Sequence, residues 1–348
     1  MISVVRIFRL GIRLAAWATP RVKEWHRQRH FNRFEGQRQL EYRNWSEAEK
    51  YLALALVERR HSAKRRFELL LGLEKAQRRQ SKLAEAEQSA RTAIAVAVEA
   101  RNQSLHSQAL DALVDVQLDQ GKHSDAEQTI AEITGIESAQ PRPNVALLAQ
   151  CSRKLGSTFL KNGRNEEAMQ AYQEAAQLSE QAFGPAHVET ANSFAGLGML
   201  HRQHGNHAEA QRCLRRALEI HRTVSGAESL EATQDLHHLA ASLEESGDLD
   251  GAATEYERVL ALKQRQVGAN FEETAEEQVH LAALYLRAGR TAPARELVLH
   301  AIGALEQKGG PRLARALETL ANVEERMGRT EDARRWREVV ANIAATQA

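Results

Sequence analysis

Apolar positions along this chain recur at the three-and-four spacing of amphipathic helices. Between Ala210 and His221, small and apolar side chains fall on one face of a helix and charged side chains on the others. Valine, isoleucine and threonine form no alternating runs joined by hairpin turns, and aromatic residues make up only 5% of the chain. The pattern predicts an all-α protein.

The helical pattern repeats with a period of 42 residues. A glycine that can end one helix in the left-handed conformation is followed five residues later by an alanine small enough for close helix approach. A second set of glycines, at positions 184, 226, 268 and 310, is expected where each second helix ends. The signature residues are Gly121, Ala126, Gly163, Ala168, Gly205, Ala210, Gly247, Ala252, Gly289, Ala294, Gly328 and Ala333.

Each unit is therefore expected to be a helix, a tight turn, a second helix and a turn. Residues 1–28 form a separate basic segment in this interpretation, and residues 29–348 form the repeat domain. Regular repeats span about 107–308, degenerate repeats about 29–106, and a capping repeat about 309–345.

The degenerate repeats keep the five-residue step but lack the glycine. Arg43 and Ser81 stand at its position, ahead of Ala48 and Ala86. The proline-containing stretch 137–144 does not break the period, so we expect a long loop between repeats there.

Several positions within the repeats match a known motif. They are Phe194 with Leu197 and Gly198, Leu155 with Gly156, Leu281 and Ala282 with Tyr285, Ala168 with Tyr172, and Ala252 with Tyr256. The chain resembles a tetratricopeptide repeat array, in the 42-residue form found in kinesin light chains. The resemblance implies a right-handed superhelical solenoid of roughly eight stacked antiparallel helix pairs, whose first helices line a concave groove that holds a peptide.

The same resemblance selects the residues that would face this groove. Among them, Arg153, Lys161, Asn192 and Arg202 resemble an incomplete form of the sets that capture a peptide carboxylate. The alternative is that they are ordinary solvated side chains. The candidate groove residues are Arg153, Ser157, Lys161, Asn192, Met199, Arg202, His237, Glu244, Glu245, Glu276 and Arg287.

Charge is distributed unevenly along the chain. Residues 1–80 carry 19 Lys and Arg against 8 Asp and Glu, whereas the remainder carries 28 against 38. A basic end attracts anionic lipid, nucleic acid or an acidic partner, and the acidic remainder repels the first two.

Residues 1–20 contain arginines and apolar side chains but no acidic residue. Three interpretations remain open: a helix in a membrane interface, a helix that caps the end of the array, and a presequence of mitochondrial type. The arginines make a membrane-spanning helix a poor fit. The candidate membrane contacts are Arg6, Phe8, Arg9, Arg13 and Trp17.

A basic cluster between Arg59 and Arg66 offers a further alternative, a regulatory or nucleic-acid-associated subunit. No aromatic side chains are interleaved with these charges at stacking intervals, so we do not expect nucleic acid as a partner.

Candidate catalytic chemistry is sparse. The sequence has no phosphate-binding loop, zinc-protease motif, nucleophile elbow or paired-cysteine motif. His201, His204 and His207 are interrupted by Gly205 and lack further ligands nearby, so no metal is expected. His238 and His280 lie one period apart and are interpreted as packing residues. We therefore predict a non-catalytic, cytoplasmic protein-binding scaffold or adaptor without a cofactor, and a membrane-peripheral assembly factor is the first alternative.

Overall fold

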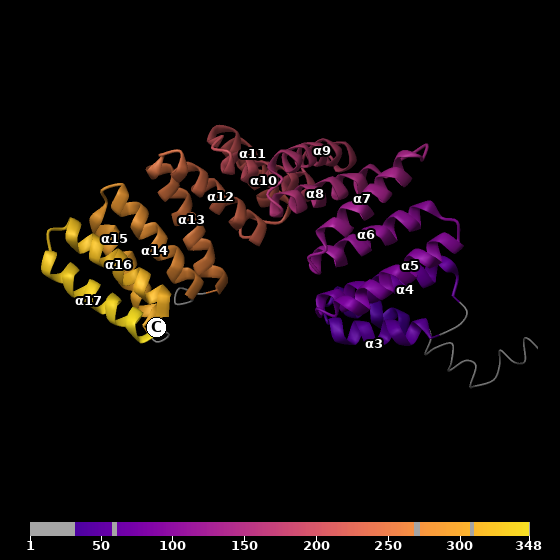
Figure 1. The fold of residues 1–348 in the computed structure, drawn as a ribbon, viewed down its shortest axis with the longest axis horizontal. Coiled ribbons are helices and arrows are strands. Elements are labelled where there is room, and N and C mark those ends of the chain that lie inside the picture. Colours follow the sequence, from indigo (N-terminus) through magenta and orange to yellow (C-terminus); the bar gives the residue numbers. More distant parts are fainter. Residues whose placement is uncertain (1–31, 58–60, 268–271, 307–309, 348) are drawn as a thin grey trace, which may run out of the picture. The chain divides into compact units, whose positions relative to one another are not determined.

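The described part of the chain is entirely helical. The computed structural model describes residues 32–57, 61–267, 272–306 and 310–347, and these contain α-helices and no β-strand (Figure 1). The 1–28 segment, with its candidate membrane contacts, lies outside the described residues. So do Arg59 and Arg60 of the basic cluster.

The chain divides into two compact units, residues 1–151 and 152–348, with the boundary inside one helix. Unit 1 contains a helical stretch at residues 32–41, followed by helices that pack in sequential order. Those helices are α3 (Trp45–Leu56), α4 (Ala63–Arg79), α5 (Leu83–Glu99), α6 (Gln103–Asp119), α7 (His123–Ser138) and the first part of α8 (Val145–Lys161).

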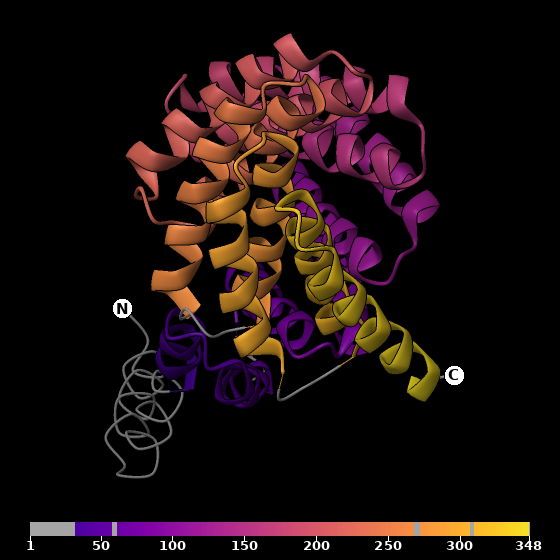
Figure 2. The ribbon, with the colours of Figure 1, turned by 90° about the vertical axis from the view of Figure 1, so that its left-hand side faces the viewer.

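Unit 2 continues the same alternation. Its helices run side by side in Figure 2, and short turns join them so that neighbours in the chain are antiparallel. The helices after α8 are α9 (Asn165–Phe183), α10 (Val188–Gln203), α11 (His207–Val224), α12 (Leu230–Glu245), α13 (Leu249–Val267), α14 (Glu272–Arg287), α15 (Thr291–Leu305), α16 (Gly310–Arg326) and α17 (Thr330–Gln347).

The described helices make eight pairs, each with a first and a second helix, which confirms the predicted solenoid of stacked pairs. The turn inside a pair has the predicted geometry. Gly205 has φ 73°, its amide donates to the Arg202 carbonyl at 3.0 Å, and the Asn206 amide donates to the His201 carbonyl at 2.8 Å. These bonds satisfy carbonyls that would otherwise be orphaned at the helix end.

The signature alanines lie where the helices approach one another most closely. Ala210 and its equivalents at 126, 168, 252 and 294 have no exposed surface, and neither do Ala48 and Ala86 in the degenerate repeats. The second set of glycines is less uniform. Gly184 ends α9 as predicted and Gly226 follows α11, but Gly310 begins α16, and Gly268 is outside the described residues.

The proline-containing stretch forms the loop between α7 and α8. Its ends are held by Glu137, which is 1% exposed and accepts a hydrogen bond from the Asn144 amide at 2.8 Å. Burying a carboxylate is tolerated when such a donor satisfies it.

The first helices of successive repeats form a closer layer than the second helices. Among the described residues, α4 contacts α6, α10 contacts α12, and α14 contacts α16, whereas no second helix contacts the next second helix to the same degree. We call the surface formed by α10, α12, α14 and α16 the first-helix face of unit 2.

Candidate binding surface

Ion pairs link neighbouring first helices across the first-helix face of unit 2. Arg202 Nη1 on α10 lies 2.7 Å from Glu245 Oε1 on α12. The preceding residue, Glu244, pairs with Arg287 on α14. Each pair spans 43 positions of the chain, about one repeat. The helices are therefore joined by charges that recur with the period.

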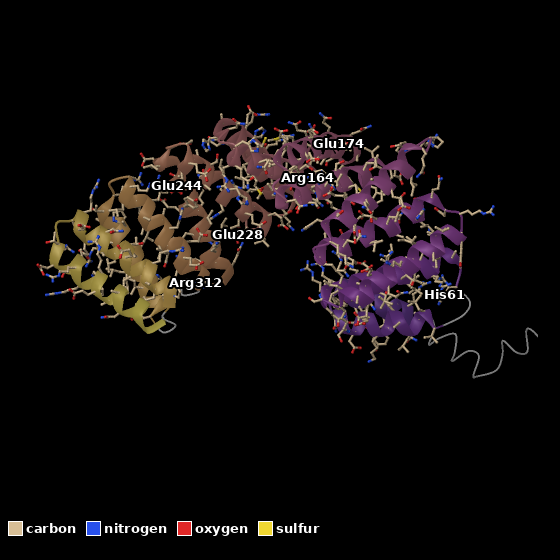
Figure 3. The ribbon with its side chains drawn as sticks, in the orientation of Figure 1. His61, Arg164, Glu174, Glu228, Glu244 and Arg312 are labelled. Atoms are coloured by element: carbon tan, nitrogen blue, oxygen red, sulfur yellow. The ribbon has the colours of Figure 1, made fainter. Side chains whose placement is uncertain are left out.

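The same arrangement continues towards both ends of unit 2. Arg153 Nε on α8 lies 3.0 Å from Glu189 Oε2 on α10. At the other end, Glu276 Oε1 on α14 lies 2.5 Å from Arg312 Nε on α16. Glu244 and Arg312 are labelled in Figure 3 on their respective helices. Six of the candidate groove residues thus form ion pairs across neighbouring first helices.

Aromatic and imidazole rings cluster at the centre of this face. The Tyr256 ring on α13 is 3% exposed and lies edge-on between two histidines. Its centroid is 5.6 Å from that of His237 on α12 and 4.7 Å from that of His280 on α14. The cluster joins two first helices through a second helix that lies behind them.

Burial and charge shift the ionisation of this cluster. Burial lowers the pKa of His238 to about 4, and the neighbouring His237 and Arg202 lower it further. Burial also lowers the pKa of His237, although Glu277 opposes the shift. For Tyr256, burial and the carboxylates of Glu244 and Glu277 raise the pKa of the phenol. The imidazoles of His237 and His238 are thus held in the neutral form at pH 7.

The remaining candidate residues differ in their exposure and contacts. Lys161 is exposed at the end of α8, and Asn192 and Met199 are half-buried on α10. Ser157 bonds with the phenol of Tyr172, whose pKa is raised by burial. The four residues that resemble a carboxylate-capturing set do not behave as one group, because Arg153 and Arg202 already bind Glu189 and Glu245.

Comparison with known proteins agrees with this architecture. Residues 147–223 match the family model described as tetratricopeptide repeat. This part of the chain thus matches tetratricopeptide repeats, and the fold is similar to that of tetratricopeptide-repeat solenoids. Folds of this kind are typically non-catalytic and generally serve as protein-interaction scaffolds. No curated protein sequence matches the chain significantly.

Solved structures with the same fold cover most of the chain. BtubC (BKLC) from P. vanneervenii is 20% identical with a TM-score of 0.58, covering 67% of this chain and 92% of BtubC. The apo form of RapI is 16% identical with a TM-score of 0.64, covering 80% and 77%. The apo form of the quorum sensor NprR from B. thuringiensis is 14% identical with a TM-score of 0.61, covering 98% and 93%.

The sequence analysis did not identify all the residues that shape the first-helix face. Tyr256 had been noted only as part of the repeat motif, and His280 only as a packing residue. In the structure the His280 side chain is 46% exposed and donates to Glu244 Oε2 at 3.0 Å. Packing is therefore an incomplete account of His280. The 42-residue spacing of His238 and His280 was the available signal, but it does not specify which neighbours each ring meets.

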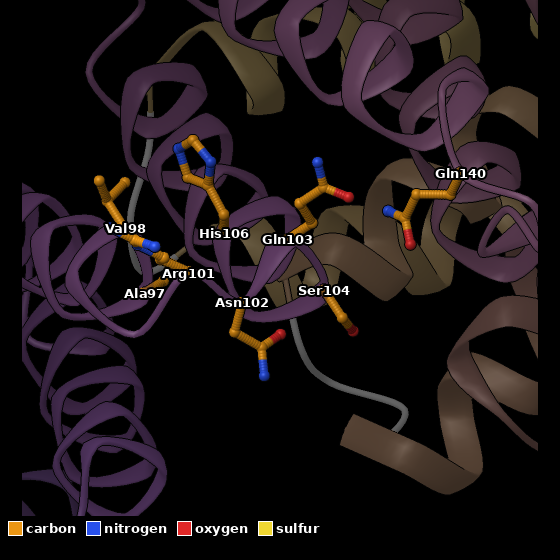
Figure 4. A pocket seen from close by; sticks show the side chains of 8 residues that line it. All are labelled: Ala97, Val98, Arg101, Asn102, Gln103, Ser104, His106 and Gln140. Carbon is orange, nitrogen blue, oxygen red and sulfur yellow. The ribbon is translucent and has the colours of Figure 1, made fainter.

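Unit 1 contains a cavity that is larger and more polar than the cavity between α14 and α16 in unit 2. It has a volume of about 640 Å³ and lies where α5 turns into α6, with Gln140 across from Gln103 and Ser104 (Figure 4). Its lining is mostly neutral, and Arg101 and His106 are the groups that can carry charge. The cavity is lined by Ala97, Val98, Arg101, Asn102, Gln103, Ser104, His106 and Gln140.

Another cation of unit 1, Arg78, is neutralised within the protein. Arg78 lies 3.1 Å from Glu74, 3.1 Å from Asp115 and 3.3 Å from Asp119. Its charge is therefore already engaged by carboxylates within the protein. Lys64 and Arg66 remain exposed at the start of α4.

Proposed function

We propose that the chain is a non-catalytic scaffold or adaptor that binds a protein or peptide along the first-helix face of unit 2. The observation that carries this proposal is the series of ion pairs joining the first helices, from Arg153–Glu189 to Glu276–Arg312. A surface fixed before the partner arrives loses less conformational entropy on binding.

The chemistry of this face suits recognition. Its charges alternate in sign, and they surround the half-buried rings next to Tyr256. Alternating charges select the register of a partner, whereas aromatic surface supplies affinity. The histidines that burial holds neutral belong to this packed cluster.

Other chemistry finds less support in the described residues. No group of three His, Cys, Asp or Glu side chains in this part of the chain is placed to hold a metal ion. None of the described helices has the length and apolar character needed to cross a membrane. Membrane association through residues 1–20, a presequence and a cytoplasmic location remain predictions from the sequence.

Site-specific photo-crosslinking tests the proposal. Benzoylphenylalanine would replace Met199, on α10 within the proposed surface, in the full chain. The matched control would carry it at Arg212, which is 71% exposed on the second helix α11. After irradiation in a lysate of the source cells, we expect a discrete adduct from position 199 and none from position 212.

The identity of the adduct then defines the partner by mass spectrometry. Adducts formed only from position 212, or no adduct from either position, would count against a receptor role for the first-helix face. Thermal unfolding of both variants checks that the substitution has left the repeats folded.

A further inference from the structure

A cavity opens on the first-helix face between α14 and α16. It has a volume of about 210 Å³ and is bounded behind by Leu305 of α15. Val279 and Leu305 in its walls are 4% and 1% exposed, and Ala283 is half-buried. The interior of the cavity is therefore mainly apolar.

The cavity occurs where a repeated polar bridge is missing. In three consecutive second helices, α9, α11 and α13, one residue bonds to the residue fourteen positions later, on the next first helix: Ser179 with Ser193 at 3.4 Å, His221 with Asp235 at 2.6 Å, and Lys263 with Glu277 at 2.7 Å. The next members of the series, one 42-residue period on, are Leu305 and Thr319.

Leucine cannot form the bridge, and both residues line the cavity instead. The Thr319 hydroxyl donates to the carbonyl of Arg315 in its own helix at 2.9 Å. The change from a polar pair to Leu305 and Thr319 thus replaces a bridge between repeats with an apolar opening.

The rim of the cavity is positively charged. Glu276 is offset by Arg312 at 2.5 Å, and His280 is bonded to Glu244. Arg315 is exposed on the rim and forms no ion pair with any other described residue. Its guanidinium provides a charge-assisted donor for a carboxylate.

The volume limits what can enter. Pockets for whole small-molecule ligands measure about 300–1,000 Å³, and this cavity is smaller. It suits a single large apolar side chain. A group presented beside that side chain would meet the cationic rim.

We propose that this cavity anchors one large apolar side chain of the bound peptide, and that Arg315 binds a carboxylate on the adjacent residue. The inference rests on the proposed function, since it assigns the partner's chemistry at the α14–α16 end of the first-helix face. The partner is thus a peptide segment in which an aromatic or large aliphatic residue stands next to an acidic one.

Fluorescence anisotropy with the full chain tests the chemistry directly. The probes are short fluorescein-labelled Gly-Ser peptides that carry Phe-Asp, Phe-Lys or Ala-Asp at their centre. We expect Phe-Asp to bind at least about tenfold more tightly than Ala-Asp, because the aromatic side chain loses its contact with water. Equal affinity for Phe-Asp and Ala-Asp would overturn the proposal.

Two variants separate the apolar and charged contributions. Ala283→Leu fills the cavity and should abolish the preference for Phe-Asp over Ala-Asp. Arg315→Glu, at an exposed position, should weaken the binding of the Phe-Asp peptide by about three- to fivefold and strengthen the binding of the Phe-Lys peptide. The control is Ala261→Leu, a half-buried alanine on α13 outside this cavity, which should leave all three affinities unchanged.

Repeating the photo-crosslinking with these variants separates a failure of this inference from a failure of the proposed function on which it rests. If the adduct at position 199 persists in Ala283→Leu and Arg315→Glu with unchanged yield, and the peptide preferences are also unchanged, the face binds a partner but the cavity is not its anchor. If no adduct forms in the unsubstituted chain, the proposed function itself fails.

Discussion

The turns in the degenerate repeats of unit 1 and the turns of unit 2 have the same backbone but different residues at the left-handed position. In unit 1, Ser81 takes the left-handed conformation with φ 60°, its amide bonds to the Arg78 carbonyl at 2.9 Å, and the next amide bonds to Gln77 at 3.0 Å. In unit 2, Gly205 makes the equivalent bonds with φ 73°. The turn geometry therefore survives without the glycine, at a cost in backbone strain.

Unit 1 supports its turns with side chains that reach the preceding repeat. Lys82 Nζ lies 2.6 Å from Glu49, and Gln80 donates to the same carboxylate at 2.9 Å. One repeat later, Lys122 and Gln120 bind Glu87 in the same way, both at 3.0 Å. Because the second of these turns contains Gly121, the same side-chain bonds occur with and without glycine. The comparison teaches that the turn keeps its backbone hydrogen bonds when serine takes the left-handed position.

The largest difference between the units is expected where helices touch through glycine. A Cβ at Gly196 in unit 2 would lie 2.3 Å from Cε1 of Tyr172, whereas a Cβ at Gly72 in unit 1 would lie 3.2 Å from the nearest side-chain carbons. We expect Gly196→Ala to lower the free energy of unfolding by about 3 kcal/mol. Gly72→Ala should lower it by less than about 1 kcal/mol, as measured by urea unfolding.

Gly135→Ala provides the control for helix propensity. No atom lies within 4 Å of a Cβ at Gly135, so this change should raise stability by up to about 1 kcal/mol. If Gly196→Ala proved no more destabilising than Gly72→Ala, close packing at Tyr172 would not be the distinguishing feature of unit 2.

Acid should weaken unit 2 through its buried imidazoles. The folded chain holds the pKa of His238 at about 4, below the unfolded value of about 6.5, so the unfolded chain binds more protons between these values. Stability is therefore fully present above pH 6.5 and is lost as the pH falls towards 4. The expected loss from this group is on the order of 1–3 kcal/mol.

His238→Gln should reduce this pH dependence. Urea unfolding at pH 7 and near pH 4.5 gives the change in the free energy of unfolding for the variant and for the unsubstituted chain. The contribution of carboxylates is the same in both proteins, so it cancels when the two changes are subtracted. Identical pH dependence in the two proteins would rule out His238 as a source of the acid sensitivity.

The carboxylate that bridges repeats in unit 1 should act in the same direction. Hydrogen bonds from Arg91, Lys122 and Gln120 lower the pKa of Glu87 to about 2. Its contribution is thus present above the unfolded pKa of about 4.3 and is lost as the pH falls through the folded value. Glu87→Gln should cost about 1 kcal/mol at pH 7, because its cationic partners remain in contact with solvent.

Glu85→Gln, at an exposed position on the same helix, is the matched control and should change stability by less than about 0.5 kcal/mol. Chemical denaturation of both variants at neutral and acidic pH measures the difference. An equal loss in both would mean that the bonds to Glu87 do not stabilise the stack.

The smallest effects should come from exchanging the turn residues themselves. Ser81→Gly should stabilise unit 1 by about 0.5–1 kcal/mol by relieving left-handed strain, and Gly247→Ala should destabilise unit 2 by about 1 kcal/mol. The site at Gly247 has space for a Cβ, so strain alone acts there. We expect Ser81→Gly to raise the midpoint temperature of thermal unfolding and Gly247→Ala to lower it. Shifts of the same sign in the two variants would contradict this explanation.

The sequence alone determined the repeat, the helix pairs and the turns. These features depend on local requirements: a left-handed residue such as Gly205 where a helix ends, and a small one such as Ala210 where helices meet. Such requirements recur at each period and are visible without knowledge of the neighbours. The same reasoning placed Arg43 and Ser81 at turns although glycine was absent.

Only the tertiary structure decided which side chains meet. The residues chosen from the sequence included Arg202, Glu244, Glu245 and Arg287, but their pairing depends on how each first helix is rotated against the next. The apolar cavity arose for the same reason. Leu305 looks like an ordinary core leucine in the sequence, and only its packing opposite Thr319 shows that a bridge between repeats has been replaced by open space.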